Sequence, residues 1–186
     1  SMYNGLDSFL SKFCSIIDDA IRGYKRIMVI THTDADGLVS GSILTKAIVR
    51  EGGRCLLRCV SDLTPNVLAS IADEGHDIYI FTDLGAGLAD AIDEHIGKSR
   101  GKEWLVIDHH QLPEHEVHDD RVCNAWKFNI DGGKEACAGT MAYKVAYGLD
   151  PRNEDLSALA VVSMVADRQD QGERKSLLGL NLEVAE

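Results

Sequence analysis

Hydrophobic and polar positions along this chain alternate between two kinds of spacing. Short runs rich in apolar residues, each about the length of a strand, occur at about 27–31, 54–60, 78–82, 103–107 and 121–124. Between them, apolar side chains return every three or four residues, as they do in helices. The helical stretches are 6–23, the residues from Gly37 to Gly52, the segment opened by Thr64-Pro65, 87–97, 136–148 and 154–166. This alternation predicts an α/β fold with a doubly wound, mainly parallel sheet and helices on both faces.

Four of the apolar segments end directly before residues that can bind a metal ion. The residues that follow them are His32-Thr33-Asp34-Ala35-Asp36, then Asp83, then Asp108-His109-His110, and finally Asp167. In an open parallel sheet the carboxyl ends of the strands face one crevice, where ligands bind. We therefore expect side chains that are far apart in the sequence to converge there: His32, Asp34, Asp36, Asp83, Asp108, His109 and His110.

The spacing within each group gives further expectations. His32, Asp34 and Asp36 are two residues apart, and alternate side chains of an extended chain share one face, so all three can reach one site. His109 and His110 are adjacent and should therefore point in different directions. One of them can then bind a metal while the other faces a substrate.

Several carboxylates in one crevice need positive charge. Without a cation, the four aspartates would repel one another and raise each other's pKa: Asp34, Asp36, Asp83 and Asp167. Imidazole and carboxylate ligands suit divalent ions, and oxygen-rich sites favour Mg²⁺ or Mn²⁺. Two such ions, roughly 3.5–4 Å apart, can activate water and hold both oxygens of an in-line displacement, as in phosphatases and nucleases. The alternative, that each aspartate only caps a helix, leaves the histidines unexplained.

The same residues resemble, in order, the four motifs of the DHH phosphoesterase superfamily, and the match covers about residues 27–170. The matching segments are His32-x-Asp34-x-Asp36-Gly37-x-x-Ser40, Thr82-Asp83-x-Gly85, Asp108-His109-His110 and Ala166-Asp167. The superfamily includes RecJ-type exonucleases, oligoribonuclease/phosphoadenosine-phosphate phosphatases, cyclic-dinucleotide phosphodiesterases and family II inorganic pyrophosphatases. The resemblance implies a metal-dependent phosphoesterase.

Two further segments favour the RecJ-type members. Pro113 follows shortly after the paired histidines, and the small-residue stretch 136–146 is similar to a helix that RecJ-like proteins place between the third and fourth motifs. After Asp167 the chain reads Arg168-Gln169-Asp170-Gln171-Gly172, which departs from the apolar continuation usual in bacterial RecJ. The resemblance is therefore to the N-terminal catalytic domain of a divergent RecJ-like, single-strand-specific exonuclease, with its substrate and cleavage polarity left open.

The resemblance also implies a cofactor and a ligand set. Two divalent ions are expected, one held by His32, Asp34 and Asp83, and the other by Asp36, Asp83, His109 and Asp167. Asp83 would bridge the two ions. Mn²⁺ is the expected metal, with Mg²⁺ and Co²⁺ as alternatives.

Four more residues receive roles from the resemblance. Asp108 would orient metal ligands without binding the metal itself. His110 would face the scissile phosphate, so His110 and Asp108 are the candidate catalytic residues. Ser40 and Arg168 are candidate substrate contacts, although a structural salt bridge is an equal alternative for Arg168 because it stands beside Asp167.

Composition limits these interpretations. The chain has 186 residues, is 45% hydrophobic and carries a formal net charge of −11, which fits one domain with one core. So acidic a chain lacks the broad basic surface of most nucleic-acid-binding proteins, although bound cations can invert the local charge at a phosphoester site. No apolar run approaches the ~18 residues of a membrane span. Five cysteines, odd in number and without zinc spacing, favour a reduced, cytoplasmic protein.

The two ends of the chain give expectations about domain organisation. Ser1-Met2 is typical of an expression remnant ahead of a native start. Residues 173–186 resemble the start of a helix that leads, in the superfamily, to a second, substrate-clamping domain. That domain is absent from residues 1–186, which we expect to form a DHH catalytic domain. Because small misplacements of a substrate cost orders of magnitude in rate, such a domain alone should cleave long single strands weakly.

Three functions remain open from the sequence, which also leaves the oligomeric state open. The first is exonuclease activity on single-stranded DNA or short oligonucleotides. The second is hydrolysis of a small phosphoester, such as phosphoadenosine phosphate, a cyclic dinucleotide or pyrophosphate. The third is a binding role beside replication or repair proteins. Trp126 and Phe128 could stack on bases, although packing at the edge of the core is the commoner role. The complete ligand motifs favour an enzyme.

Overall fold

The computed structural model describes residues 3–115 and 118–186, so the Ser1-Met2 segment lies outside the described residues. Its centre is a five-stranded sheet in which all neighbouring strands are parallel, with the order β2-β1-β3-β4-β5. The strands are β1 (Arg26–His32), β2 (Arg54–Val60), β3 (Ile78–Thr82), β4 (Glu103–Asp108) and β5 (Val122–Asn124). From the edge strand β2 the chain returns to the far side of β1, so the strand order reverses between β1 and β3. Ligands of doubly wound sheets bind at such a reversal.

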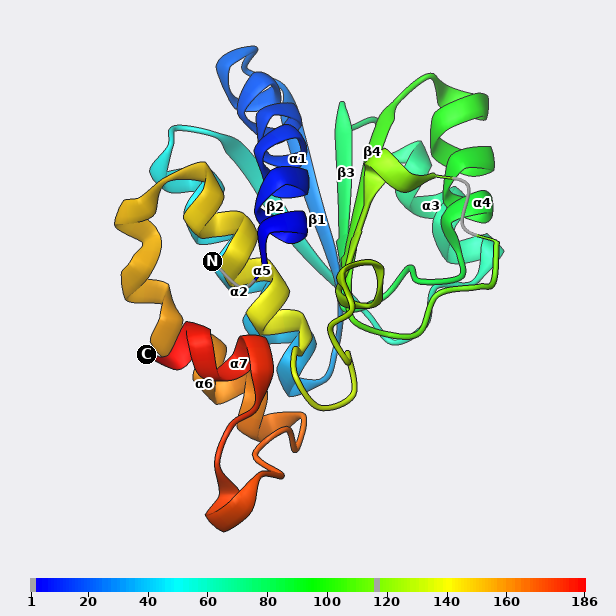
Figure 1. Cartoon of the computed structure of the whole chain (residues 1–186). Helices are drawn as coiled ribbons and strands as arrows, with labels where there is room; N and C mark the ends of the chain where they lie inside the picture. Colours follow the sequence, from blue (N-terminus) through cyan, green and yellow to red (C-terminus); the bar gives the residue numbers. More distant parts are fainter. Residues whose placement is uncertain (1–2, 116–117) are drawn as a thin grey trace.

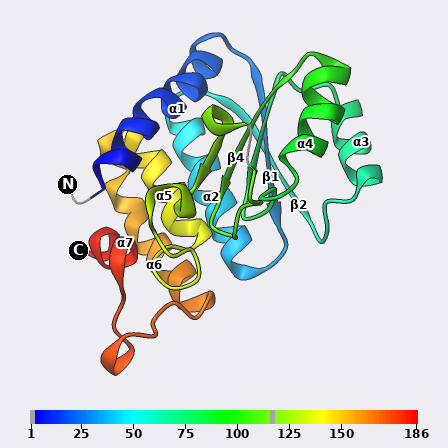
Figure 2. The same ribbon diagram turned by 45° about the vertical axis from the view of Figure 1, so that its right-hand side comes forward.

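Helices cover both faces of the sheet, as the sequence predicted (Figure 1). One face carries α1 (Asn4–Arg22), α2 (Ala35–Arg50) and α5 (Ala138–Leu149), and the other carries α3 (Pro65–Asp73) and α4 (Ala89–Ile92). On the side away from the sheet, α2 and α5 pack against α6 (Ser157–Ala166), and α7 (Gly179–Ala185) packs against α6 and α5 (Figure 2). Short helical turns complete the chain: η1 (Asp93–Lys98), η2 (Asp119–Arg121), η3 (Ala125–Phe128), η4 (Pro151–Leu156) and η5 (Glu173–Lys175).

The core lies in two layers because successive side chains of a strand point to opposite faces. Toward α1, α2 and α5, the central strands β3 and β4 bury Ile78, Ile80, Leu105 and Ile107. Toward α3 and α4 they bury Tyr79, Phe81, Trp104 and Val106. Both strands are covered on both faces, which explains why they occur as continuous apolar runs and not as alternating ones.

Three predicted elements differ in detail from the structure. The helix expected at 87–97 is a short α4 that continues into the π-helical turn η1, where a side chain at Gly97 would meet Oδ1 of Asp93 at 2.3 Å. The helix expected at 154–166 begins as the 3-10 turn η4 and becomes α-helical only at Ser157. In the region predicted to begin a connecting helix, α7 packs onto the domain and buries Leu180 completely.

Two expectations from composition can be compared with the described residues. All five cysteines are free thiols. In the described part of the chain, no helix is both long enough and apolar enough to cross a membrane.

Candidate metal centre

The first group of candidate ligands enters the site through a tight turn between β1 and α2. His32 ends β1, Asp34 is the N-cap of α2, and Asp36 lies in the first helical turn. The segment is therefore not extended, contrary to the prediction from alternate spacing. A side chain at Gly37 would lie 2.3 Å from the carbonyl oxygen of His32, so glycine allows the chain to turn this sharply.

Asp34 both caps a helix and faces the site. Its Oδ1 accepts a hydrogen bond from the backbone N–H of Gly37 over 2.7 Å. Its Oδ2 lies 3.2 Å from Nδ1 of His32. Capping and metal binding, which the sequence presented as alternatives, do not exclude one another, because the cap uses Oδ1 and Oδ2 lies beside His32.

Asp83 follows β3 in a strained backbone conformation. Its φ is +62°, in the left-handed region that residues other than glycine seldom adopt, and its side chain is buried. The backbone N–H of Asp83 donates to the carbonyl oxygen of Ile107 over 3.1 Å, which holds the turn against β4. Such strain persists where the surrounding structure imposes it, and it is commonest at functional sites.

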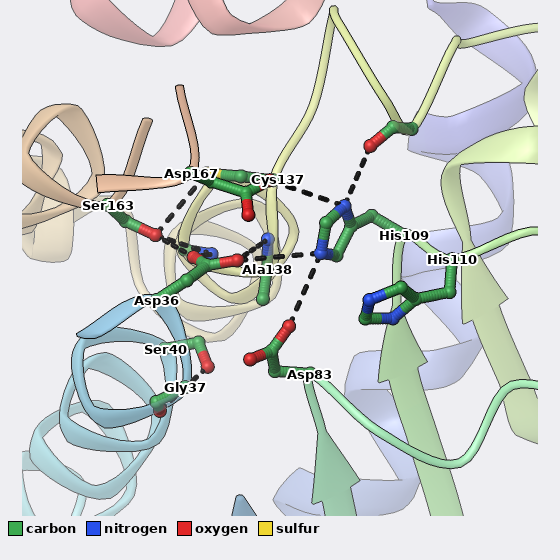
Figure 3. A network of polar contacts seen from close by, with 12 residues as sticks. Asp36, Gly37, Ser40, Asp83, His109, His110, Cys137, Ala138, Ser163 and Asp167 are labelled. Carbon is green, nitrogen blue, oxygen red and sulfur yellow. Dashed lines mark hydrogen bonds and ion pairs between the residues drawn. The ribbon is translucent and has the colours of Figure 1, made fainter. Parts of the chain in front are cut away.

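The imidazole of His109 lies at the centre of the cluster (Figure 3). Its Nε2 is 3.3 Å from Oδ1 of Asp83 and 3.4 Å from Oδ2 of Asp36. Its Nδ1 donates to the carbonyl oxygen of Gly132 over 2.7 Å and lies 4.0 Å from Oδ2 of Asp167, the residue that ends α6. The ring thus contacts groups from four separate segments of the chain.

The two adjacent histidines lie side by side. The ring centroids of His109 and His110 are 4.4 Å apart and their planes are tilted by 40°, so the expectation that the two rings diverge was wrong. Alternation applies to residues within a strand, whereas both histidines follow the last residue of β4. They differ in burial: His109 is buried, and His110 is exposed beside it.

The candidate ligands form three overlapping groups, one of which consists of Asp83, Asp108, His109 and His110. Ligand atoms of His32, Asp34 and Asp83 all lie within 4.8 Å of one another, and so do those of Asp36, His109 and Asp167. The contact between Asp83 and His109 joins the groups. The two groups of His32 and of Asp36 contain the residues that the resemblance implied for two ions, but Asp83 belongs to the former and not to the latter. Carboxylate oxygens with one imidazole each suit a divalent cation such as Mn²⁺ or Mg²⁺, so the residues present fit the expected cofactor.

Negative charge dominates the site. Burial raises the pKa of the Asp83 carboxyl to about 7, and the charges of Asp36 and Asp34 add to this effect. Burial also raises the pKa of Asp167, and Asp36 again contributes. Asp167 lies at the C-terminal end of α6, where the helix dipole further disfavours an anion.

A proton on His109 balances part of this charge. Burial alone would lower the pKa of His109, but its hydrogen bonds to Asp36 and Asp83 outweigh burial and raise the pKa to about 12. Burial likewise opposes ionisation of Asp36, but hydrogen bonds from His109 and Ser163 lower its pKa overall. The imidazolium therefore occupies the position where a divalent cation could supply the positive charge, after displacing the proton.

Asp36 is also bound by a helix N-terminus, which sequence reasoning missed. The backbone N–H groups of Ala138 and Gly139, which begin α5, each donate to its carboxylate over 3.1 Å, and the Ser163 hydroxyl donates to it as well. A side chain at Gly139 would lie 2.3 Å from Oγ of Ser163. The small residues of 136–146 were the available signal, since they allow α5 to approach this close.

The two candidate substrate contacts have different environments. Ser40 is completely buried beneath the site and donates to the carbonyl oxygen of Gly37, so its hydroxyl does not face the cleft. Arg168 is exposed, adopts a φ of +56°, and its guanidinium forms no ion pair within the described residues. Of the two, only Arg168 is exposed to solvent.

A cavity of about 460 Å³ adjoins the ligand cluster and is bordered by His110, Trp126, Gly133 and Asp167. The Trp126 indole donates to the carbonyl oxygen of His109 over 2.9 Å. Phe128 instead packs against Phe9, with ring centroids 5.3 Å apart. Within the described residues, no lysine or arginine lines this cavity.

Comparison with known proteins gives one family. The profile of the DHH family, N-terminal domain, matches residues 26–167. An uncharacterised protein of Methanocaldococcus jannaschii, MJ0831, is 32% identical over 175 residues, which is 90% of this chain and 38% of that protein. The chain therefore spans well under half the length of this relative.

Solved structures share the fold. RecJ of Thermus thermophilus in complex with Mn²⁺ has a TM-score of 0.76 and 21% identity over 95% of this chain and 26% of RecJ. An exonuclease RecJ bound to manganese has a TM-score of 0.78 and 20% identity, over 95% of this chain and 46% of that one. CDC45 from Entamoeba histolytica has a TM-score of 0.60 and 15% identity, over 85% and 33%. At these identities the likeness concerns the fold.

Proposed function

This chain belongs to the DHH family, and from that premise we propose that it is a metal-dependent phosphodiesterase that hydrolyses single-stranded DNA or short oligonucleotides. The observation that carries the proposal is the pair of ligand groups that meet at Asp83 and His109. Each group holds carboxylate oxygens and one imidazole, and both lie at the reversal of strand order, where doubly wound sheets bind ligands.

The cofactor is two divalent ions, with Mn²⁺ the expected metal. One would be held by His32, Asp34 and Asp83, and the other by Asp36, Asp83, His109 and Asp167. When bound, such ions supply Lewis-acid stabilisation of a phosphoryl group and a nucleophilic water at neutral pH. The protein's own contribution is to fix these ligands: the N-terminus of α5 donates to Asp36, the carbonyl oxygen of Gly132 accepts from His109, and β4 holds the turn at Asp83.

His110 is the residue best placed to act on the substrate. Its hydrogen bond to Asp108 raises its pKa, which favours a proton on both ring nitrogens. The Nδ1 proton is bound to Asp108 over 2.7 Å, so the Nε2 proton remains for a phosphate oxygen or a leaving oxygen. Asp108 is completely buried and acts by holding this ring in place.

The cleft favours short substrates over long ones. A long single strand needs cationic groups along its backbone, yet the cavity beside the ligands is lined within the described residues by none. Trp126 offers an aromatic surface there, and the exposed Arg168 directly follows the proposed ligand Asp167. The absence of lysine and arginine from the described lining of this cavity also favours a second candidate function. That function is hydrolysis of small phosphoesters such as cyclic dinucleotides, phosphoadenosine phosphate or pyrophosphate.

Hydrolysis assays distinguish these candidates. The protein would be incubated with Mn²⁺ or with EDTA and offered single-stranded DNA of decreasing length, a dinucleotide, phosphoadenosine phosphate, a cyclic dinucleotide and pyrophosphate. We expect Mn²⁺-dependent cleavage that is stronger on short oligonucleotides than on long strands. Asp83→Asn should abolish it, whereas Asp18→Asn, at an exposed ion pair on α1, should not.

Two results would contradict the proposal. Activity that is unchanged by EDTA would exclude the metal centre from the reaction. Binding of single-stranded DNA or of replication or repair proteins, with no cleavage of any substrate in the presence of Mn²⁺, would favour a binding role.

A further inference from the structure

Two completely buried carboxamides lie behind the proposed metal centre. Gln169 follows Asp167 by two residues, and Asn181 belongs to α7. Neither residue exposes any surface to solvent. Amide side chains are seldom buried to this extent, and those that are buried have hydrogen-bond partners. The partners of this pair join the C-terminal helix to two of the proposed ligands.

The orientation of the Gln169 carboxamide is fixed by its surroundings. Its Nε2 lies 3.0 Å from the carbonyl oxygen of Gly132, 3.0 Å from that of Ala136 and 3.2 Å from Oδ2 of Asp167. These oxygens are hydrogen-bond acceptors, so the amide nitrogen, and not the amide oxygen, must face them. Two hydrogens serve the three acceptors, and the shorter distances are to the two carbonyls.

Asn181 holds Gln169 from the other side. Its Nδ2 donates to Oε1 of Gln169 over 2.8 Å. Its Oδ1 accepts from the hydroxyl of Thr140 over 2.6 Å. Because Oε1 of Gln169 needs a donor, the orientation of Asn181 is fixed as well. The buried chain of hydrogen bonds therefore has one direction, from α5 through α7 to the site.

The Gly132 carbonyl oxygen connects this chain to the central imidazole. It accepts from Nε2 of Gln169 and from Nδ1 of His109, over 3.0 and 2.7 Å. A carbonyl oxygen can only accept, so a neutral His109 carries its proton on Nδ1 and presents Nε2 to Asp36 and Asp83. That is the tautomer in which His109 can bind a metal.

We propose that Gln169 is a positioning residue, held by Asn181, that fixes the tautomer of His109 and the orientation of the Asp167 carboxylate for a divalent cation. This inference rests on the proposed function, because it assumes that these two residues are ligands. Partners of this kind, bonded to metal ligands, alter metal affinity by roughly 10–100-fold when removed.

A merely structural role makes a different prediction. In that role, Gln169 does no more than hold the loop carbonyls of Gly132 and Ala136 against the domain. In that case its removal would lower the free energy of unfolding, while the folded fraction would bind metal as tightly as the wild type. Metal affinity of the folded protein is therefore the measurement that separates the two roles.

The test compares Gln169→Leu with Gln171→Leu. Gln171 is an exposed glutamine two residues away whose Nε2 donates only to the carbonyl oxygen of Arg168, so it is a matched control. Calorimetric titration with Mn²⁺ should show a dissociation constant raised roughly tenfold or more in Gln169→Leu and changed by less than about twofold in Gln171→Leu.

A second readout reports on the tautomer directly. In ¹⁵N-labelled wild-type protein loaded with Zn²⁺ as a diamagnetic probe, the Nδ1–H of His109 should give a slowly exchanging resonance. In Gln169→Leu the Gly132 carbonyl is no longer held, so this resonance should broaden or exchange faster. If the tie to Ala136 were the one that matters, its loss would leave this resonance unchanged, because Ala136 does not contact His109.

The outcomes separate this inference from the proposed function. If the wild type binds no Mn²⁺, the proposed function fails. If the wild type binds Mn²⁺ but folded Gln169→Leu binds it within about twofold and keeps the Nδ1–H resonance, only the role of Gln169 is overturned. Should Gln169→Leu not fold, Asn181→Leu decides in the same way, since it removes the donor to Oε1 of Gln169 and keeps the backbone bond from residue 181 to Glu135.

Discussion

Nδ1 of His110 lies 2.7 Å from Oδ1 of Asp108, and this contact joins a completely buried carboxylate to an imidazole whose side chain is 58% exposed. Asp108 also accepts hydrogen bonds from the backbone N–H groups of His109 and Ala86, over 2.8 and 3.0 Å. The carboxylate cannot move without breaking these bonds. It therefore holds the His110 ring at the mouth of the cleft.

We expect His110→Ala to lower turnover of a short oligonucleotide by roughly 10²-fold or more, the range typical of a general acid–base group. The Mn²⁺ content, measured on the same sample, should stay at the wild-type value, because His110 lies outside the two groups expected to hold the ions. His95→Ala, on η1, is the control and should change neither quantity. Loss of metal in His110→Ala would mean that the roles of the two histidines are reversed.

Asp83→Asn should weaken both metal sites together. Asp83 belongs to the group with His32 and Asp34, and it also contacts His109 of the other group. Calorimetric titration with Mn²⁺ should show two ions bound in the wild type and in Asp18→Asn, and a large loss of affinity in Asp83→Asn. Two ions bound to Asp83→Asn with wild-type affinity would contradict the shared position, as would anomalous scattering that places ions on other residues.

Mn²⁺ affinity should rise with pH. Hydrogen bonds to Asp36 and Asp83 raise the pKa of His109 to about 12 against the effect of burial, so the metal-free site holds a proton at neutral pH. A metal must displace that proton, and each proton released strengthens the apparent affinity by about tenfold per pH unit. Titrations at pH 6.5, 7.5 and 8.5, in two buffers of different ionisation enthalpy, measure both effects. An affinity that does not depend on pH would contradict the predicted proton release.

Two glycine substitutions should change stability in opposite directions. A side chain at Gly139 would meet Cβ of Ser163 at 2.4 Å, and overpacking of this kind costs about 1–3 kcal/mol. Alanine at Gly5, near the start of α1, would meet its nearest neighbour at 3.7 Å and gain up to about 1 kcal/mol in helix propensity. Thermal unfolding should therefore show a lower Tm for Gly139→Ala and an equal or higher one for Gly5→Ala. An unchanged Tm in Gly139→Ala would mean that α5 can move away from Ser163.

The cysteines should differ in reactivity. Burial raises the pKa of Cys14 to about 12 and that of Cys137 to about 11, so neither forms much thiolate near pH 8. Cys59 is exposed on the edge strand β2. A thiol reagent applied to the folded protein should label Cys59 first, as peptide mass spectrometry would report. Early labelling of Cys137 would indicate that α5 opens at its N-terminus.

The strands could be predicted from the sequence because β3 and β4 are buried on both faces and therefore read as uninterrupted apolar runs. The convergence of His32, Asp83 and His109 followed from the parallel order of those strands. The position of the strands follows from the local apolar pattern, and the convergence of the ligands follows from the topology of a parallel sheet. Neither prediction depends on how particular side chains pack.

The detailed contacts could not be predicted in the same way. The turn at Gly37 replaces the extended segment that the spacing of Asp34 and Asp36 predicted, because its conformation depends on a close backbone approach. Gln169 reads as an ordinary residue of a polar stretch, and Asn181 as a single polar residue among leucines. Their burial depends on where α7 packs, and no local pattern encodes that position.

The contact between Asp36 and Ser163 joins residues 127 positions apart, and this separation affects the order in which the ligand groups form during folding. The group of His32, Asp34 and Asp83 needs the chain up to β4, which holds the turn at Asp83, whereas the group of Asp36, His109 and Asp167 also needs α6 in place. In refolding followed by pulsed hydrogen exchange, we expect late protection of the Ala138 and Gly139 amides, which donate to the carboxylate of Asp36, since long-range contacts form late. The ligand groups of a newly synthesised chain would then form in sequence.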